Sequence, residues 1–206
     1  MSLQFIIGFL TFYHLAIIFK NQGRPCLYGC GWNMSNKYRK DSIRLQHWDY
    51  GWNAAYFVTI CSKNKICYFG NIIDGEMHLS ATGKIVNDLW YDITNHTKNV
   101  ELGQFVVMPN HIHGIIIINT DPVEARPALS NVGRNRFQNQ GKNTLSSIIG
   151  GYKSAVTKNA NLLMFQHAWQ PRFYEHIIRN QKSLNEIESY IINNPINWRD
   201  DKLYKE

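Results

Sequence analysis

Cysteine is scarce in this chain of 206 residues, which contains 4 cysteines. Cys26, Cys30, Cys61 and Cys67 form neither a C-x-x-C pair nor a zinc-binding spacing, so the sequence predicts no zinc finger and favours a reducing, cytoplasmic setting. Acidic residues are in the minority, because 15 Asp and Glu face 22 Lys and Arg and the net charge is +7. This excess favours an anionic partner such as nucleic acid, although an ordinary basic enzyme fits the charge equally well.

Charged residues make up only 18% of the chain and hydrophobic residues 44%, which excludes general disorder. The length suits one domain of about 150–200 residues with a short extension. A domain of that size buries roughly 70% of the surface that its unfolded chain exposes, so it needs neither a metal nor a disulfide in order to fold.

The one long apolar run lies at the N-terminus. Leu3–Phe19 has 17 residues, the lower limit for crossing a bilayer, and is interrupted by Gln4 and His14. No basic residue precedes it and no small-residue cleavage site follows it, so a signal peptide fits poorly. Because Met34 opens a polar, basic stretch, we expect residues 1–33 to be a hydrophobic extension read through from an upstream start codon and 34–206 to form the domain. A membrane anchor is the alternative.

Strand patterns dominate the first half of this domain. The expected strands are Ala55–Cys61, two hairpin arms around Asp74-Gly75, Gln104–Met108 and His111–Asn119. Pro109 cannot donate a ladder hydrogen bond, so it belongs to a turn between the last two.

Helical patterns follow the hairpin and fill the second half. Ser80 can cap a helix with an Ile85, Leu89 and Ile93 stripe, and a second stripe begins at Leu145. Residues 121–142 lack periodicity and predict a flexible loop. A capping-box pattern over Ser183–Glu186 predicts the start of a last helix that ends at Asn194, before Pro195. Together the patterns predict an α+β fold, an antiparallel sheet with helices on one face.

Two pairs of polar residues can carry chemistry. Strand alternation places His111 and His113 on one face, where two imidazoles can share a divalent ion. Tyr190 and Asn194 are four residues apart on the last helix and therefore share one helix face. Taken singly, a tyrosine at the edge of the core and a helix-ending asparagine are ordinary features.

Three ordered motifs make the pairs more specific. FVVMPNHIHGIIII (Phe105–Ile118), WQPRFYEHIIRN (Trp169–Asn180) and SYIINNPINW (Ser189–Trp198) resemble the single-tyrosine HUH transposases, and among them the REP-associated tyrosine transposases of the IS200-like group. The first strand and hairpin, AYFVTICSKNKICYFG (Ala55–Gly70), resemble the same branch. The similarity runs from about Met34 to about Trp198, and residues 1–33 have no counterpart in it.

This resemblance implies a ferredoxin-like antiparallel sheet with an extra C-terminal helix that carries the catalytic tyrosine, here Tyr190. It implies that His111, His113 and Asn194 bind Mg²⁺ or Mn²⁺, and that the substrate is single-stranded DNA, often folded into a hairpin. Cleavage would leave a 5′-phosphotyrosine and a free 3′-OH. Related enzymes act as monomers or as homodimers, and both arrangements stay open for this chain.

Basic and aromatic residues around these motifs are candidates for holding DNA. The candidates are Arg39, Lys40, Arg44, Lys153, Arg172, Phe173, Tyr174, Arg179 and Lys182. Two alternative functions stay open. One is a non-catalytic nucleic-acid-binding protein on the same fold, and the other is a metal-dependent phosphodiesterase that uses water as its nucleophile.

Overall fold

The computed structural model describes residues 50, 52–119 and 143–204 of the chain. The expected extension over residues 1–33, the loop over 121–142 and the basic residues Arg39, Lys40 and Arg44 lie outside this part. In the described part, no helix is long and apolar enough to cross a bilayer.

A four-stranded antiparallel sheet forms the centre of the domain, with strand order β4-β5-β1-β6. The sheet strands are β1 (Ala54–Cys61), β4 (Val100–Val107), β5 (His111–Ile118) and β6 (Tyr174–Ile178). β2 (Gly70–Ile73) and β3 (Glu76–Leu79) form a separate hairpin around Asp74 and Gly75, both of which have positive φ as that tight turn requires. The predicted α+β fold is therefore confirmed, and β5, which carries both histidines, is a central strand.

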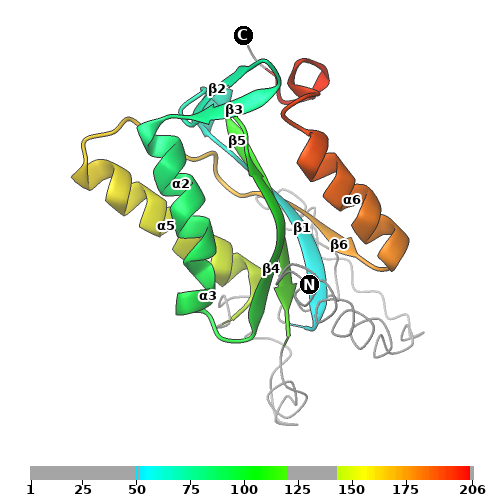
Figure 1. Ribbon diagram of the computed structural model, residues 1–206. Helices are drawn as coiled ribbons and strands as arrows, with labels where there is room; N and C mark the ends of the chain where they lie inside the picture. Colours follow the sequence, from blue (N-terminus) through cyan, green and yellow to red (C-terminus); the bar gives the residue numbers. More distant parts are fainter. Residues whose placement is uncertain (1–49, 51, 120–142, 205–206) are drawn as a thin grey trace, which may run out of the picture. The chain divides into compact units, whose positions relative to one another are not determined.

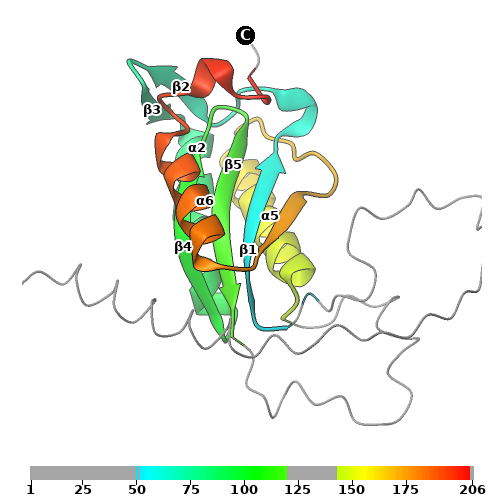
Figure 2. The same ribbon diagram turned by 90° about the vertical axis from the view of Figure 1, so that its right-hand side faces the viewer.

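Helices cover both faces of the sheet (Figure 1). α2 (Ala81–Tyr91), α3 (Ile93–His96) and α5 (Leu145–Leu162) lie on one side, and α6 (Gln181–Asn193) lies on the other side. Two short 3-10 turns, η1 (Lys63–Lys65) and η2 (Trp198–Asp200), follow β1 and α6. Figure 2 shows α6 in front of β4 and β5, with β1 and β6 to its side.

The core between the sheet and α2 is aromatic. The Trp90 ring stacks on Phe105 at a centroid distance of 4.4 Å and meets the edge of Tyr152 at 5.4 Å. Gly114 of β5 lies directly beneath Trp90, where a Cβ would collide with the indole. The face of β5 opposite the histidines therefore packs against the aromatic core.

Several elements differ from the sequence-based prediction. The capping box at Ser183 is wrong, because α6 begins at Gln181 and its N-cap is Asn180, whose side chain accepts from the Ser183 N–H. β4 begins at Val100 rather than Gln104, since a bulge between Leu102 and Phe105 interrupts the alternation by which a strand is recognised. The sequence pattern does not predict β6. It is an edge strand of five residues, and its first three residues, Tyr174, Glu175 and His176, are polar and not fully buried.

Candidate metal and nucleophile site

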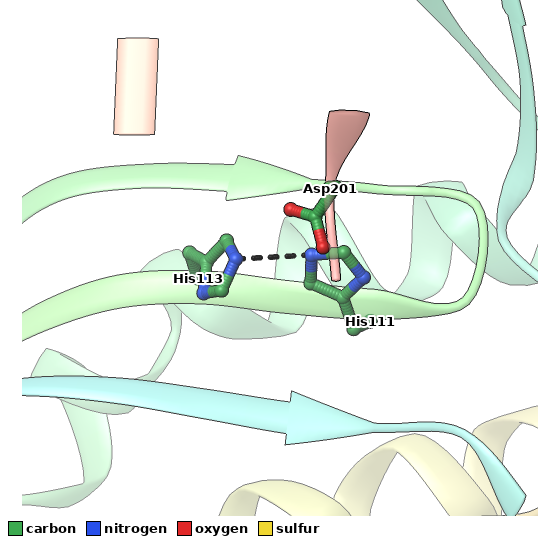
Figure 3. A group of neighbouring side chains, drawn as sticks. All are labelled: His111, His113 and Asp201. Carbon is green, nitrogen blue, oxygen red and sulfur yellow. Dashed lines mark hydrogen bonds between the residues drawn. The ribbon is translucent and has the colours of Figure 1, made fainter. Parts of the chain in front are cut away.

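The two histidines meet on the α6 side of the sheet. Alternation along β5 directs both imidazoles to this face and Ile112 to the other. His111 is fully buried and His113 is 3% exposed, and their Nε2 atoms lie 3.0 Å apart (Figure 3). Two ring nitrogens this close together could bind one metal ion.

The other ring nitrogen of each histidine has its own partner. Nδ1 of His111 lies 2.8 Å from Oδ1 of Asn110, and Nδ1 of His113 lies 2.8 Å from Oγ1 of Thr59. Thr59 stands directly opposite His113 in the β1–β5 register, so it faces the same side of the sheet. These contacts orient both rings, as the outer partners of metal-ligating histidines do.

Tyr190 reaches the same point from α6. Its phenolic oxygen lies 3.2 Å from Nε2 of His113 and donates to Oδ2 of Asp201 at 3.2 Å. The Phe57 ring stacks on His113 at 5.2 Å and meets Tyr190 edge-on at 6.2 Å, which fixes the two rings relative to each other. Tyr190 is 46% exposed, so it is the member of the site most open to solvent.

The end of α6 and the segment after it complete the cluster. Asn194, the C-cap of α6, is 2% exposed and donates from Nδ2 to Oδ2 of Asp201 at 3.1 Å. Its Oδ1 is buried and accepts no hydrogen bond from the residues that the structure describes. Asp201 follows η2, and its second oxygen, Oδ1, accepts from the backbone N–H of Leu203.

Burial controls the protonation states in the site. It lowers the pKa of His113 to about 4, against a weaker opposing effect of Asp201, and it lowers the pKa of His111 well below its usual value. Both imidazoles are therefore neutral at pH 7. Burial, together with the charge of Asp201, raises the pKa of the Tyr190 phenol to about 12.

The residues of this cluster fit a divalent cation. Ligand atoms of His111, His113 and Asp201 all lie within 4.8 Å of one another (Figure 3). Neutral imidazoles and a carboxylate are suitable donors. The amide of Asn194 contacts Asp201, and its buried Oδ1 is an acceptor without a partner among the described residues. The group could therefore hold a metal ion.

The other predicted residues lie around this centre. Tyr174, the first residue of β6, is 57% exposed and stands opposite Thr59, so it shares the face of the histidines. Arg172 precedes β6 in the chain and Arg179 follows it, and both are exposed. Phe173, directly before β6, is partly buried. His176 pairs with Phe57 on the same face as Tyr174 and is exposed.

Two predicted DNA-binding lysines already have partners. Nζ of Lys153 on α5 donates to the backbone carbonyls of Gln170 at 2.7 Å and Arg172 at 3.1 Å, and so braces the segment that leads into β6. Lys182 forms a weak, exposed ion pair with Glu186 at 3.9 Å.

Sequence reasoning did not identify Asp201, Asn110 or Thr59. The only signal for Asp201 is an acidic pair, Asp200-Asp201, that follows the last helix. Asn110 is adjacent to the histidines in the sequence, but its role depends on contacts with distant backbone. Thr59 becomes recognisable only when the strand register is known.

No protein-family model matches the chain. An uncharacterized protein from Haemophilus influenzae is 40% identical over 181 residues, which cover 83% of this chain and 99% of that protein. A solved structure of a REP-associated tyrosine transposase bound to a REP hairpin matches with a TM-score of 0.51 at 19% identity, over 77% of this chain and 74% of the other. The fold implied by the resemblance in the motifs is thus confirmed.

Proposed function

Because the chain belongs to one family with the Haemophilus influenzae protein and has the fold of the REP-associated tyrosine transposase, we propose that it cleaves and rejoins single-stranded DNA through a covalent 5′-phosphotyrosine. The observation that carries this proposal is the distance of 3.2 Å between the phenolic oxygen of Tyr190 and Nε2 of His113. This distance would put the attacking phenol beside the atoms that could hold a metal ion, which supports a transesterification.

The proposal places the activity in residues 34–206 of a cytoplasmic protein. His111, His113 and Asp201 would hold Mg²⁺ or Mn²⁺, with Oδ1 of Asn194 as a fourth donor. This ion would polarise the scissile phosphate and neutralise the charge that develops on it. Imidazole is a softer ligand than Mg²⁺ prefers, so we expect Mn²⁺ to bind at least as well.

Tyr190 performs the bond exchange. Its oxygen attacks the phosphorus, the bond from phosphorus to the 3′ oxygen breaks, and the leaving oxygen takes up a proton to become a 3′-OH. The phenolic proton passes to water, which reaches the half-exposed side chain. In the reverse step a 3′-OH attacks the phosphotyrosine, and Tyr190 regains its proton. The covalent bond conserves the phosphodiester energy, so rejoining needs no ATP.

The open face beside the site gives the DNA strand a path. Thr59 of β1 is paired across the sheet with His113 on one side and with Tyr174 of β6 on the other. His176 lies two residues further along β6, on the same face. A strand whose phosphate lies at Tyr190 can stack an unpaired base on the exposed Tyr174 ring. Arg172 and Arg179 are exposed next to the two ends of β6 and would contact phosphates outside the proposed reaction centre.

A denaturing gel tests the proposal. The purified protein is incubated with labelled single-stranded hairpin DNA and Mn²⁺, and a protein–DNA adduct that survives denaturation is expected. Tyr190→Phe should abolish the adduct and retain DNA binding. Tyr91→Phe should leave the adduct unchanged, because the Tyr91 ring contacts Phe105 on the α2 side of the sheet.

Other outcomes would favour the alternative functions. Cleavage without any adduct would favour a phosphodiesterase that uses water. Salt-dependent binding without cleavage, in the presence or absence of Mn²⁺, would favour a non-catalytic nucleic-acid-binding protein. The distance of 3.2 Å between Tyr190 and His113 favours the enzyme, because a non-catalytic binding protein does not require a phenol beside the two imidazoles.

A further inference from the structure

The two histidines face each other in a way that constrains their hydrogens. Their Nε2 atoms are 3.0 Å apart, which is a hydrogen-bond distance. A neutral imidazole carries one ring hydrogen, on either Nδ1 or Nε2. The contact therefore requires that one of the two rings holds its hydrogen on Nε2 and that the other holds it on Nδ1.

Asn110 determines which of the two histidines carries its hydrogen on Nδ1. Its Nδ2 lies 3.2 Å from the carbonyl oxygen of Lys65 and 2.9 Å from that of Leu203. Carbonyl oxygens only accept, so the amino end of the amide must face them and Oδ1 must face His111. Because Oδ1 also only accepts, Nδ1 of His111 carries the hydrogen and Nε2 presents a lone pair.

The hydrogen of His113 follows from this. Its Nε2 must donate to Nε2 of His111, and its Nδ1 must then accept from the hydroxyl of Thr59. A hydroxyl, unlike an amide oxygen, can either donate or accept. The partner of His113 therefore permits both ring forms, whereas the partner of His111 permits one.

We propose that Asn110 and Thr59 are positioning residues with different tasks: Asn110 locks His111 in the form that offers Nε2 to a cation, and Thr59 lets His113 change to that form when the cation arrives. On binding, His113 loses its hydrogen from Nε2 to water and gains one from water on Nδ1. The Thr59 hydroxyl turns from donor to acceptor, and the charge of both rings is unchanged.

Asn110 has a second effect on the same site. By donating to the carbonyl of Leu203 it anchors the C-terminal segment, in which the Leu203 N–H in turn donates to Asp201. One buried side chain thus connects His111 to the segment that carries the carboxylate.

Nitrogen-15 NMR of histidine-labelled protein tests this proposal without any variant. The pattern of couplings between ring nitrogens and carbon-bound hydrogens distinguishes the two neutral forms. In the metal-free protein we expect Nδ1–H for His111 and Nε2–H for His113. Addition of Zn²⁺, a diamagnetic ion that imidazole binds well, should convert His113 to Nδ1–H and leave His111 unchanged.

An Nε2–H form of His111 in the metal-free protein, or an unchanged His113 at saturating Zn²⁺, would overturn the proposal. The inference rests on the metal site of the proposed function, but the metal-free spectrum needs neither metal nor DNA. A failure to form the DNA adduct and a failure here are therefore separate results.

Variants give a second readout, the affinity for Mn²⁺ measured by titration calorimetry. Thr59→Val removes the hydroxyl at nearly constant volume and should weaken Mn²⁺ binding about 10–100-fold, whereas Thr59→Ser should retain it. Equal affinities of the two variants would contradict the role of Thr59.

Asn110→Leu should weaken Mn²⁺ binding by the same order, about 10–100-fold. Asn119→Leu, directly after the other end of β5, is the matched control. Its Nδ2 donates to Oε1 of Glu101 at 2.7 Å, far along the strand from the imidazoles, so its loss should leave Mn²⁺ binding unchanged. If Asn110→Leu does not fold, the comparison of Thr59→Val with Thr59→Ser and the nitrogen-15 spectrum of the unaltered protein still test the proposal.

Discussion

The phenolic oxygen of Tyr190 lies 3.2 Å from Nε2 of His113, although 77 positions separate the two residues in the chain. α6 brings them together by packing against β4, with Leu184 and Ile191 of the helix buried. The apolar packing of α6 therefore sets the distance between the Tyr190 phenol and the two imidazoles.

Asp201→Asn should lower the pKa of Tyr190 in the metal-free protein. Burial and the Asp201 charge together raise this pKa to about 12, which leaves roughly 0.1% phenolate at pH 9. A neutral amide removes the second cause and retains the first, so the pKa should fall and stay above the ordinary value of 10. Carbon-13 NMR of the Tyr Cζ atoms against pH measures it, with Tyr190→Phe to assign the signal. An unchanged midpoint would show that Asp201 does not act on the phenol.

Asp201→Asn should also weaken Mn²⁺ binding, by at least about tenfold, because it removes the anionic member of the group that could hold the ion. Asp200→Asn is the matched control, since it removes the same charge from the exposed neighbouring position. Titration calorimetry measures both. Equal losses in the two variants would mean that net charge, rather than coordination, attracts the ion.

Tyr174→Ala should weaken binding of single-stranded DNA. Loss of one stacked base costs about 1–3 kcal/mol, which corresponds to roughly 5–150-fold in affinity. Tyr91 at the end of α2 is 57% exposed, as Tyr174 is, but its ring contacts Phe105 on the α2 side of the sheet. Tyr91→Ala should therefore leave DNA affinity unchanged in a fluorescence anisotropy titration, and a loss as large as that of Tyr174→Ala would refute stacking on β6.

Two glycine substitutions should change stability in opposite directions. Gly114→Ala forces a methyl group against the Trp90 ring and should cost about 1–3 kcal/mol. Gly150→Ala, at an exposed helical position with open space around it, should add roughly 0.5–1 kcal/mol by restricting the unfolded chain. Urea denaturation measures both free energies of unfolding. A stable Gly114→Ala protein would mean that the Trp90 ring can move aside.

Local patterns were sufficient for much of the fold. The turn at Asp74-Gly75, the Ser80 cap and the strand containing His111 and His113 were predicted from neighbouring residues and are confirmed. α5 also formed as predicted and continues through Gly150 and Gly151, because both lie on its exposed side. Such features depend on backbone geometry and alternation, which a short stretch of sequence contains.

The rest depends on contacts between distant segments. β6 has five residues and, among the described strands, pairs with β1 alone. A segment this short is too brief to show the alternation by which a strand is recognised in a sequence. Asp201 approaches the histidines because the chain turns after α6, and no spacing rule relates it to β5. The tasks that we propose for Asn110 and Thr59 likewise require three-dimensional contacts that a sequence does not contain.

Along the start of β5, substitutions should impair activity at one position and folding at the next. Odd-numbered positions, His111 and His113, face Tyr190 and the proposed reaction centre, so a scan of substitutions there should produce folded but inactive protein. Even-numbered positions, Ile112 and Gly114, face the aromatic core, so substitutions should reduce the yield of folded protein instead. A library that measured abundance and activity side by side would therefore show the two readouts alternating from one residue to the next.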